Sequence, residues 1–171
     1  MRRRLWRDAL AQLAHMVPNP MLRTVDYTQD GKLSERTLAA TAARVYQVVE
    51  FDFRSVTRQG NRSTIFAPLI CGWLEQQITV ADACATLLFH LARLMPLAMV
   101  VHSGEVSLHG WFKTFGLNHS TQRTFFSQAC HLGADPMLWD RSHFVRVPDG
   151  TRENGARQCC FYLNPKNCIS V

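Results

Sequence analysis

The stretch VYQVVEFDF, residues 45–53, decides which fold this sequence predicts. Apolar, aromatic and β-branched residues dominate it, which favours a buried β-strand. Side chains alternate across a strand, so Glu50 and Asp52 are expected on one face and their apolar neighbours on the other. Two carboxylates on one sheet face repel each other unless a cation or a proton neutralises them. The pair therefore indicates either a divalent-metal site or a strand end whose acids reach water.

The composition limits the kinds of protein that this chain can be. The chain has 171 residues and is 47% hydrophobic, so we expect a single domain with one core. No apolar run is long enough to span a membrane, and Asp8 and Gln12 interrupt the stretch that a secretory signal would need. We therefore expect a cytoplasmic protein with no membrane association and with reduced cysteines. Cys159, Cys160 and Cys168 leave a zinc site open as an alternative, although they form no C-x-x-C pair.

The positive charge of the chain favours a partner that carries phosphate groups. The net charge is +6, and most of the 19 basic residues are arginines. Guanidinium groups grip phosphates through two parallel hydrogen bonds, so a nucleic acid or a nucleotide is a natural partner. Many basic proteins bind neither, so the charge alone leaves this interpretation open.

Periodicity and turn signals beyond residue 45 predict an α+β fold with the order strand, helix, strand, strand, helix, strand. This is the β-α-β-β-α-β pattern of ferredoxin-like or RNA-recognition-motif-like domains, here with a helical insertion and one added strand. Residues 1–44 are expected to form an N-terminal helix and a connector packed on a palm at 45–171. The expected helices are 3–17, 65–77, 79–93 and 121–132, and the expected strands are 45–53, 97–101, 106–112, 143–147 and 159–163.

A second motif lies in HSGEVSLHGWF, residues 102–112. On a strand, Ser107 and His109 share one face, and both side chains can donate hydrogen bonds to phosphate oxygens. The turn at Ser103 and Gly104 can add backbone amides. A polar strand edge without a ligand is the simpler alternative.

A third group follows the second long helix. Asp135 can complete a three-carboxylate metal site with the two acids of the first strand, and Asp140 is a rival for that role. Arg146 and Arg152 lie where they can clamp phosphates near the metal. Taken singly, Asp135 fits an Asp-Pro turn and the arginines fit an ordinary surface.

Together, VVEFD, HSGEVSLHGWF and LGADPMLWDRSHFVRVPDGTRENG resemble the three motifs of the archaeo-eukaryotic primase superfamily, in order and approximate spacing. They are most similar to the primase-polymerase-like proteins of plasmids, phages and other mobile elements. The resemblance covers about residues 33–165, and its middle motif is the most specific. Glu50 is a departure, because many members have Asp there.

The resemblance implies a DNA primase or polymerase that joins nucleoside triphosphates on a DNA template. Glu50, Asp52 and Asp135 would hold Mg²⁺ or Mn²⁺, while Ser107 and His109 would hold the incoming triphosphate on an open face of the sheet. Arg146 would add a contact to nucleotide or template. Many relatives carry a helicase or accessory domain, so a replication protein is an expected partner.

Two other functions remain open from the sequence. One is a metal-dependent nuclease or replication-initiator nickase, although the paired histidines typical of such nickases are absent around Leu108. The other is a catalytically silent nucleic-acid-binding module, in which Trp111 would stack on a base.

Overall fold

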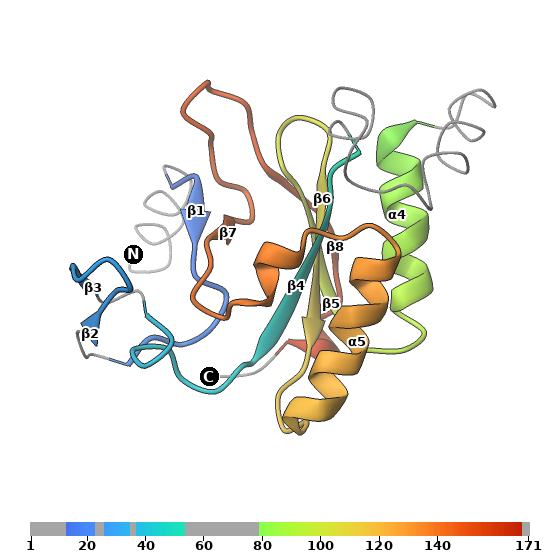
Figure 1. Ribbon diagram of the computed structural model, residues 1–171. Coiled ribbons are helices and arrows are strands. Elements are labelled where there is room, and N and C mark those ends of the chain that lie inside the picture. The colour runs from blue at the N-terminus through green and yellow to red at the C-terminus, as the bar shows by residue number, and fades with distance from the viewer. Residues whose placement is uncertain (1–12, 23–25, 35–36, 54–78, 169–171) are drawn as a thin grey trace.

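The structure is a computed structural model that describes residues 13–22, 26–34, 37–53 and 79–168 (Figure 1). The expected helix at 65–77 and the loop before it lie outside the described residues. The main body is a four-stranded antiparallel sheet with the order β4-β6-β5-β8. Its strands are β4 (Tyr46–Phe51), β5 (Leu97–His102), β6 (Leu108–Lys113) and β8 (Cys159–Leu163).

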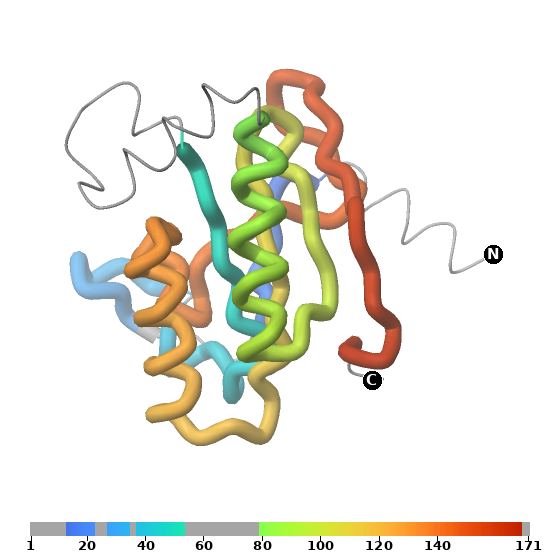
Figure 2. The backbone as a smooth tube through the Cα atoms, turned by 90° about the vertical axis from the view of Figure 1, so that its right-hand side faces the viewer, coloured from blue at the N-terminus to red at the C-terminus, as the bar shows by residue number. Residues whose placement is uncertain are grey.

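Two helices cover one face of this sheet (Figures 1 and 2). The first, α4 (Val80–Leu91), begins with a capping box, in which the Thr79 hydroxyl and the Asp82 carboxylate each accept from the other's backbone N–H. The second, α5 (His119–His131), begins slightly before its expected start at 121. The side chain of Asn118 caps it by accepting from the Thr121 amide.

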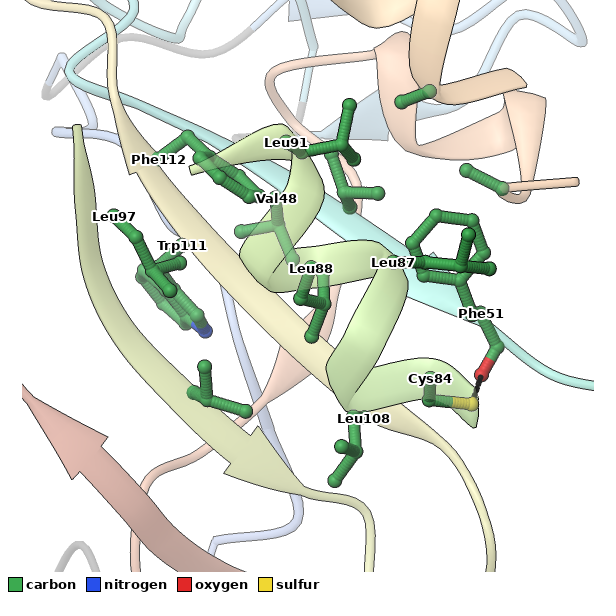
Figure 3. Packing of buried hydrophobic residues seen from close by; sticks show 14 of the residues in the cluster. Val48, Phe51, Cys84, Leu87, Leu88, Leu91, Leu97, Leu108, Trp111 and Phe112 are labelled. Atoms are coloured by element: carbon green, nitrogen blue, oxygen red, sulfur yellow. Dashed lines mark hydrogen bonds between the residues drawn. The ribbon is translucent and has the colours of Figure 1, made fainter. Parts of the chain in front are cut away.

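The core fills the space between the helices and the sheet, and at Val48 and Trp111 it continues onto the opposite face of the sheet (Figure 3). Leu88 of α4 is fully buried and packs onto β6, where position 110 is a glycine. An added Cβ at Gly110 would lie 2.6 Å from Leu88 Cδ2 and 2.9 Å from a ring carbon of Phe112. The glycine thus allows α4 to approach the sheet closely.

The topology supports the α+β prediction and departs from it in one place. Along the chain, β4, α4, β5, β6 and α5 follow the expected order of elements, and in the sheet β6 lies between β4 and β5. The expected fourth strand, 143–147, is only β7 (Val145–Arg146), and it pairs with β1 (His15–Met16) rather than with the sheet. The expectation of a helix up to Val17 is therefore wrong at its C-terminal end. Figure 1 shows this β1–β7 ribbon on the side of the sheet away from the helices.

A short 3₁₀ helix, η1 (Pro136–Trp139), lies beside β4 at the edge of the sheet. Gln47 of β4 is fully buried and donates its Nε2 hydrogens to the carbonyls of Leu138 and Val48, 2.8 Å away in each case. The Asp135 amide donates to the Glu50 carbonyl at 3.0 Å. Because these bonds occupy the free edge of β4, no further strand is needed there.

The remaining elements are small. A turn at 29–32, with Gly31 at a φ of 77°, joins the hairpin strands β2 (Asp26–Tyr27) and β3 (Leu33–Ser34). A second 3₁₀ helix, η2 (Pro165–Asn167), follows β8. None of the described helices combines the length and apolar character needed to cross a membrane.

The close contact at Gly110 gives a stability prediction. Gly110→Ala should destabilise the fold by about 1–3 kcal/mol, because the buried Leu88 has little space to move away. In a double-mutant cycle read by urea denaturation, the same change in a Leu88→Ala background should cost clearly less. Strictly additive effects would show that the two residues do not compete for space.

Candidate functional site

The candidate site begins with two residues that face each other across neighbouring strands. The register of β4 against β6 pairs Glu50 directly with His109. His109 Nε2 lies 3.3 Å from Glu50 Oε1, at an orientation that falls short of a hydrogen bond. Both side chains lie on the sheet face away from the helices, because their strand neighbours Val49 and Gly110 face α4 and the core. The predicted alternation is therefore confirmed over 46–51, the length of β4.

The electrostatic state of Glu50 reflects these neighbours. Burial alone would raise the pKa of Glu50, but the adjacent His109 and Ser107 side chains and the charge of Arg146 outweigh it and lower the pKa to about 2. Glu50 is consequently a carboxylate at any physiological pH. Its side chain is 21% exposed, so an approaching ligand can reach it.

His109 has unused hydrogen-bonding capacity. The residue is 3% exposed, and among the described residues neither of its ring nitrogens has a hydrogen-bond partner. The same is true of the indole nitrogen of Trp111, two residues along the same face. Buried polar atoms are normally satisfied, so this face has donors and acceptors in place for a group that it does not itself contain. Trp111 is too buried to stack on a base as the sequence suggested.

The turn before β6 is held in a fixed shape. Ser103 and Ser107 are buried, and Ser103 Oγ accepts from the Ser107 amide at 3.2 Å. Arg152 reaches across from a distant loop, donates to the Ser103 carbonyl at 3.3 Å, and forms an ion pair with Glu105 at 3.1 Å. Gly104, with a φ of 83°, leaves no space for a side chain against that loop. Arg152 thus positions the turn, in a role that the sequence did not suggest.

The three predicted carboxylates are not gathered into one cage. Asp52 directly follows the last residue of β4 and is half-buried. The backbone of Asp135 is bonded to that of Glu50, but its carboxylate accepts from the Met137 amide and caps η1. Asp140 accepts from the amide and hydroxyl of Ser142. Among the described residues, no three His, Cys, Asp or Glu side chains are close enough to hold a metal ion, and this includes the zinc alternative at the C-terminal cysteines.

The β1–β7 ribbon brings in a residue that sequence reasoning missed. His15 is the register partner of Arg146, whose charge acts on both His15 and Glu50. Partial burial and the charges of Arg146 and Arg152 lower the pKa of His15 below its usual range. On the other face of the ribbon, Val145 is buried in the core and Met16 packs against it. The ribbon therefore covers part of the sheet face that we expected to be open.

The donor set fits a hard cation that also binds a substrate. Mg²⁺ is commonly held by one or two carboxylates together with substrate phosphates, rather than by a complete protein cage. Glu50 is ionised, and Asp52 directly follows the end of its strand, so these two carboxylates are the candidates for that use. Arg146, Ser107 and His109 add groups that suit phosphate oxygens.

Comparisons of the chain with models of protein families, with curated proteins and with solved structures find no match. The interpretation of the site therefore depends on its own geometry and on the motifs of the sequence. The observation that any function must explain is a buried, unsatisfied histidine opposite a strongly acidic glutamate.

The low pKa of Glu50 predicts a loss of stability in acid. A carboxyl whose folded-state pKa is lowered stabilises the fold above its unfolded pKa, and this contribution is lost as the pH falls through the folded value. Unfolding free energies of wild type should therefore decrease between about pH 5 and pH 2 by about 2 kcal/mol more than those of Glu50→Gln. Denaturation curves at several pH values measure the difference. Parallel pH profiles of the two proteins would contradict the ionised, stabilised state of Glu50.

Proposed function

We propose that this protein is a template-directed nucleotidyltransferase of the primase-polymerase type, which joins nucleoside triphosphates on a DNA template. Its sheet and helices would form an RNA-recognition-motif-like palm, and it would act in the cytoplasm. The observation that carries the proposal is the Glu50–His109 pair on the sheet face away from the helices, with unsatisfied imidazole nitrogens. A triphosphate supplies acceptor oxygens for a buried imidazole N–H that has no hydrogen-bond partner among the described residues.

The other side chains have complementary roles in this proposal. Ser107 lies beside the Glu50 carboxylate and Arg146 contributes positive charge there, so both can bind phosphate oxygens at the edge of the pair. Arg152 would act indirectly, by holding the turn at Ser103 from which β6 begins. The binding of nucleotide would thus use groups that the fold already holds in place.

Glu50 and Asp52 are the residues that would hold Mg²⁺ or Mn²⁺. The chemistry that such cations supply is activation of a 3′-hydroxyl and neutralisation of the leaving pyrophosphate. Glu50 suits this use because it remains ionised, and its contact with His109 keeps the carboxylate directed across the strands. Asp135 would have to release the Met137 amide before its carboxylate could join them. A helicase or accessory replication protein remains a proposed partner.

The direct test is nucleotide incorporation by the Asp52→Asn variant. We expect incorporation on a primed and an unprimed DNA template, with Mg²⁺ or Mn²⁺, to fall by at least about 100-fold because one of two cation ligands loses its charge. Asp30→Asn is the matched control, since Asp30 is an exposed carboxylate in the β2–β3 hairpin. Full activity of Asp52→Asn, or no incorporation by wild type, would refute the proposal. Cutting of labelled DNA without added nucleotides would favour the nuclease.

A second pair of variants decides between the two rival acids. Asp135→Asn should reduce incorporation more than Asp140→Asn, because the Asp135 backbone is bonded to Glu50 while Asp140 caps a different turn. An Asn side chain can still accept from the Met137 amide, so the folded state of Asp135→Asn should be preserved. Thermal unfolding curves check that assumption. Greater sensitivity at Asp140 would assign the third carboxylate there.

A further inference from the structure

The β1–β7 ribbon presents one face on which only Arg146 has a role in the proposed reaction. His15 and Arg146 are direct register partners, and Phe144 lies two residues before Arg146 on the same side. Val145 and Met16, on the opposite face, belong to the core or pack against it. Phe144, His15 and Arg146 therefore share the face that points away from the core.

Two rings on this face already lie against each other. The centroids of His15 and Phe144 are 6.2 Å apart, with the ring planes inclined by 30°. His15 is exposed and Phe144 is 46% exposed, so an aromatic surface remains accessible beside the pair. The lowered pKa of His15 favours its neutral ring near neutral pH, which leaves Arg146 as the charged member of the group. A planar ring is the ligand group that such a surface accepts most readily.

Arg146 connects this surface with the Glu50–His109 pair. Its charge acts on the Glu50 carboxyl on one side and on the His15 imidazole on the other. Alternate residues of a strand are about 7 Å apart, similar to the separation of base and 5′-phosphate in a nucleotide. The buried, unsatisfied nitrogens of His109 are an independent indication that a polar ligand belongs at the inner end.

We propose that Phe144 and His15 form a stacking platform for the base of the incoming nucleotide, whose phosphates extend past Arg146 towards His109. The proposal builds on the nucleotidyltransferase function above, and it adds a base-binding surface on a ribbon outside the main sheet. Stacking of this kind accepts any base, because every base presents a π-face. The platform therefore contributes affinity for nucleotides without selecting among bases.

Equilibrium binding to Phe144→Ala tests the platform directly. Affinity for a nucleoside triphosphate should fall about 5- to 100-fold, the range typical of losing one base–aromatic stack. Affinity for inorganic tripolyphosphate should stay unchanged, because it has no base.

Four further variants refine this test. Phe144→Trp should bind nucleotide as wild type does, and His15→Ala should bind nucleotide more weakly without losing affinity for tripolyphosphate. Arg146→Gln should weaken both ligands. Phe115→Ala, at a 60% exposed aromatic in another turn, is the matched control.

The outcomes separate the platform from the enzymatic function. Binding that depends on Phe144, in a wild-type protein that does not extend DNA, would support the platform and refute the nucleotidyltransferase. Normal extension with an unchanged KM for nucleotide in Phe144→Ala would refute the platform alone. Equal losses for triphosphate and tripolyphosphate in Phe144→Ala would also refute it, since the residue would then act on the phosphate site. A Phe144-dependent affinity for single-stranded DNA but not for nucleotide would overturn the proposal in favour of the template.

Discussion

The antiparallel register of β4 against β6 is the constraint on which the site depends. It pairs Val49 with Gly110 on the helix face and Glu50 with His109 on the other. A slip of one residue would turn every side chain of a strand to the opposite face. The close fit of Leu88 over Gly110 opposes such a slip, because any larger residue at that point would collide with α4. Packing on one face of the sheet thereby fixes the chemistry on the other.

The second constraint is the way in which the outer edge of β4 is covered. An unpaired edge is open to other strands, and here η1 closes it through the Gln47 side chain and the Asp135 amide. With this edge covered, β7 is not part of the main sheet and pairs with β1 instead. The ribbon is tied back by the amide of Val147 and the side chain of Gln158, which both donate to the Ala14 carbonyl. The site consequently lies between a well-packed sheet and a smaller element held by few bonds.

Local patterns predicted the parts of the fold that local physics determines. Alternation predicted a strand at 45–53, which is observed at Tyr46–Phe51, and the helix predicted at 79–93 begins at its cap residue Thr79. The pairing of His15 with Arg146 joins residues far apart in sequence, so periodicity alone suggested a helix instead. The carboxylate of Asp135 was placed in a metal site, whereas the Asp-Pro turn alternative describes its observed bond to Met137. The strand pairing depends on tertiary contacts, whereas the Asp135 cap is a local interaction that the metal-site prediction overrode.

The negative charge of Glu50 affects how the proposed site can bind a triphosphate. A carboxylate with a pKa of about 2 stays negative beside the groups proposed to bind phosphate, so it opposes an incoming triphosphate. Arg146 offsets only part of that repulsion, because one guanidinium faces both Glu50 and the ligand. A divalent cation between Glu50, Asp52 and the phosphates would convert the repulsion into attraction. Cation and nucleotide should then strengthen each other's binding by the same factor, as linkage requires, and neither should bind well alone.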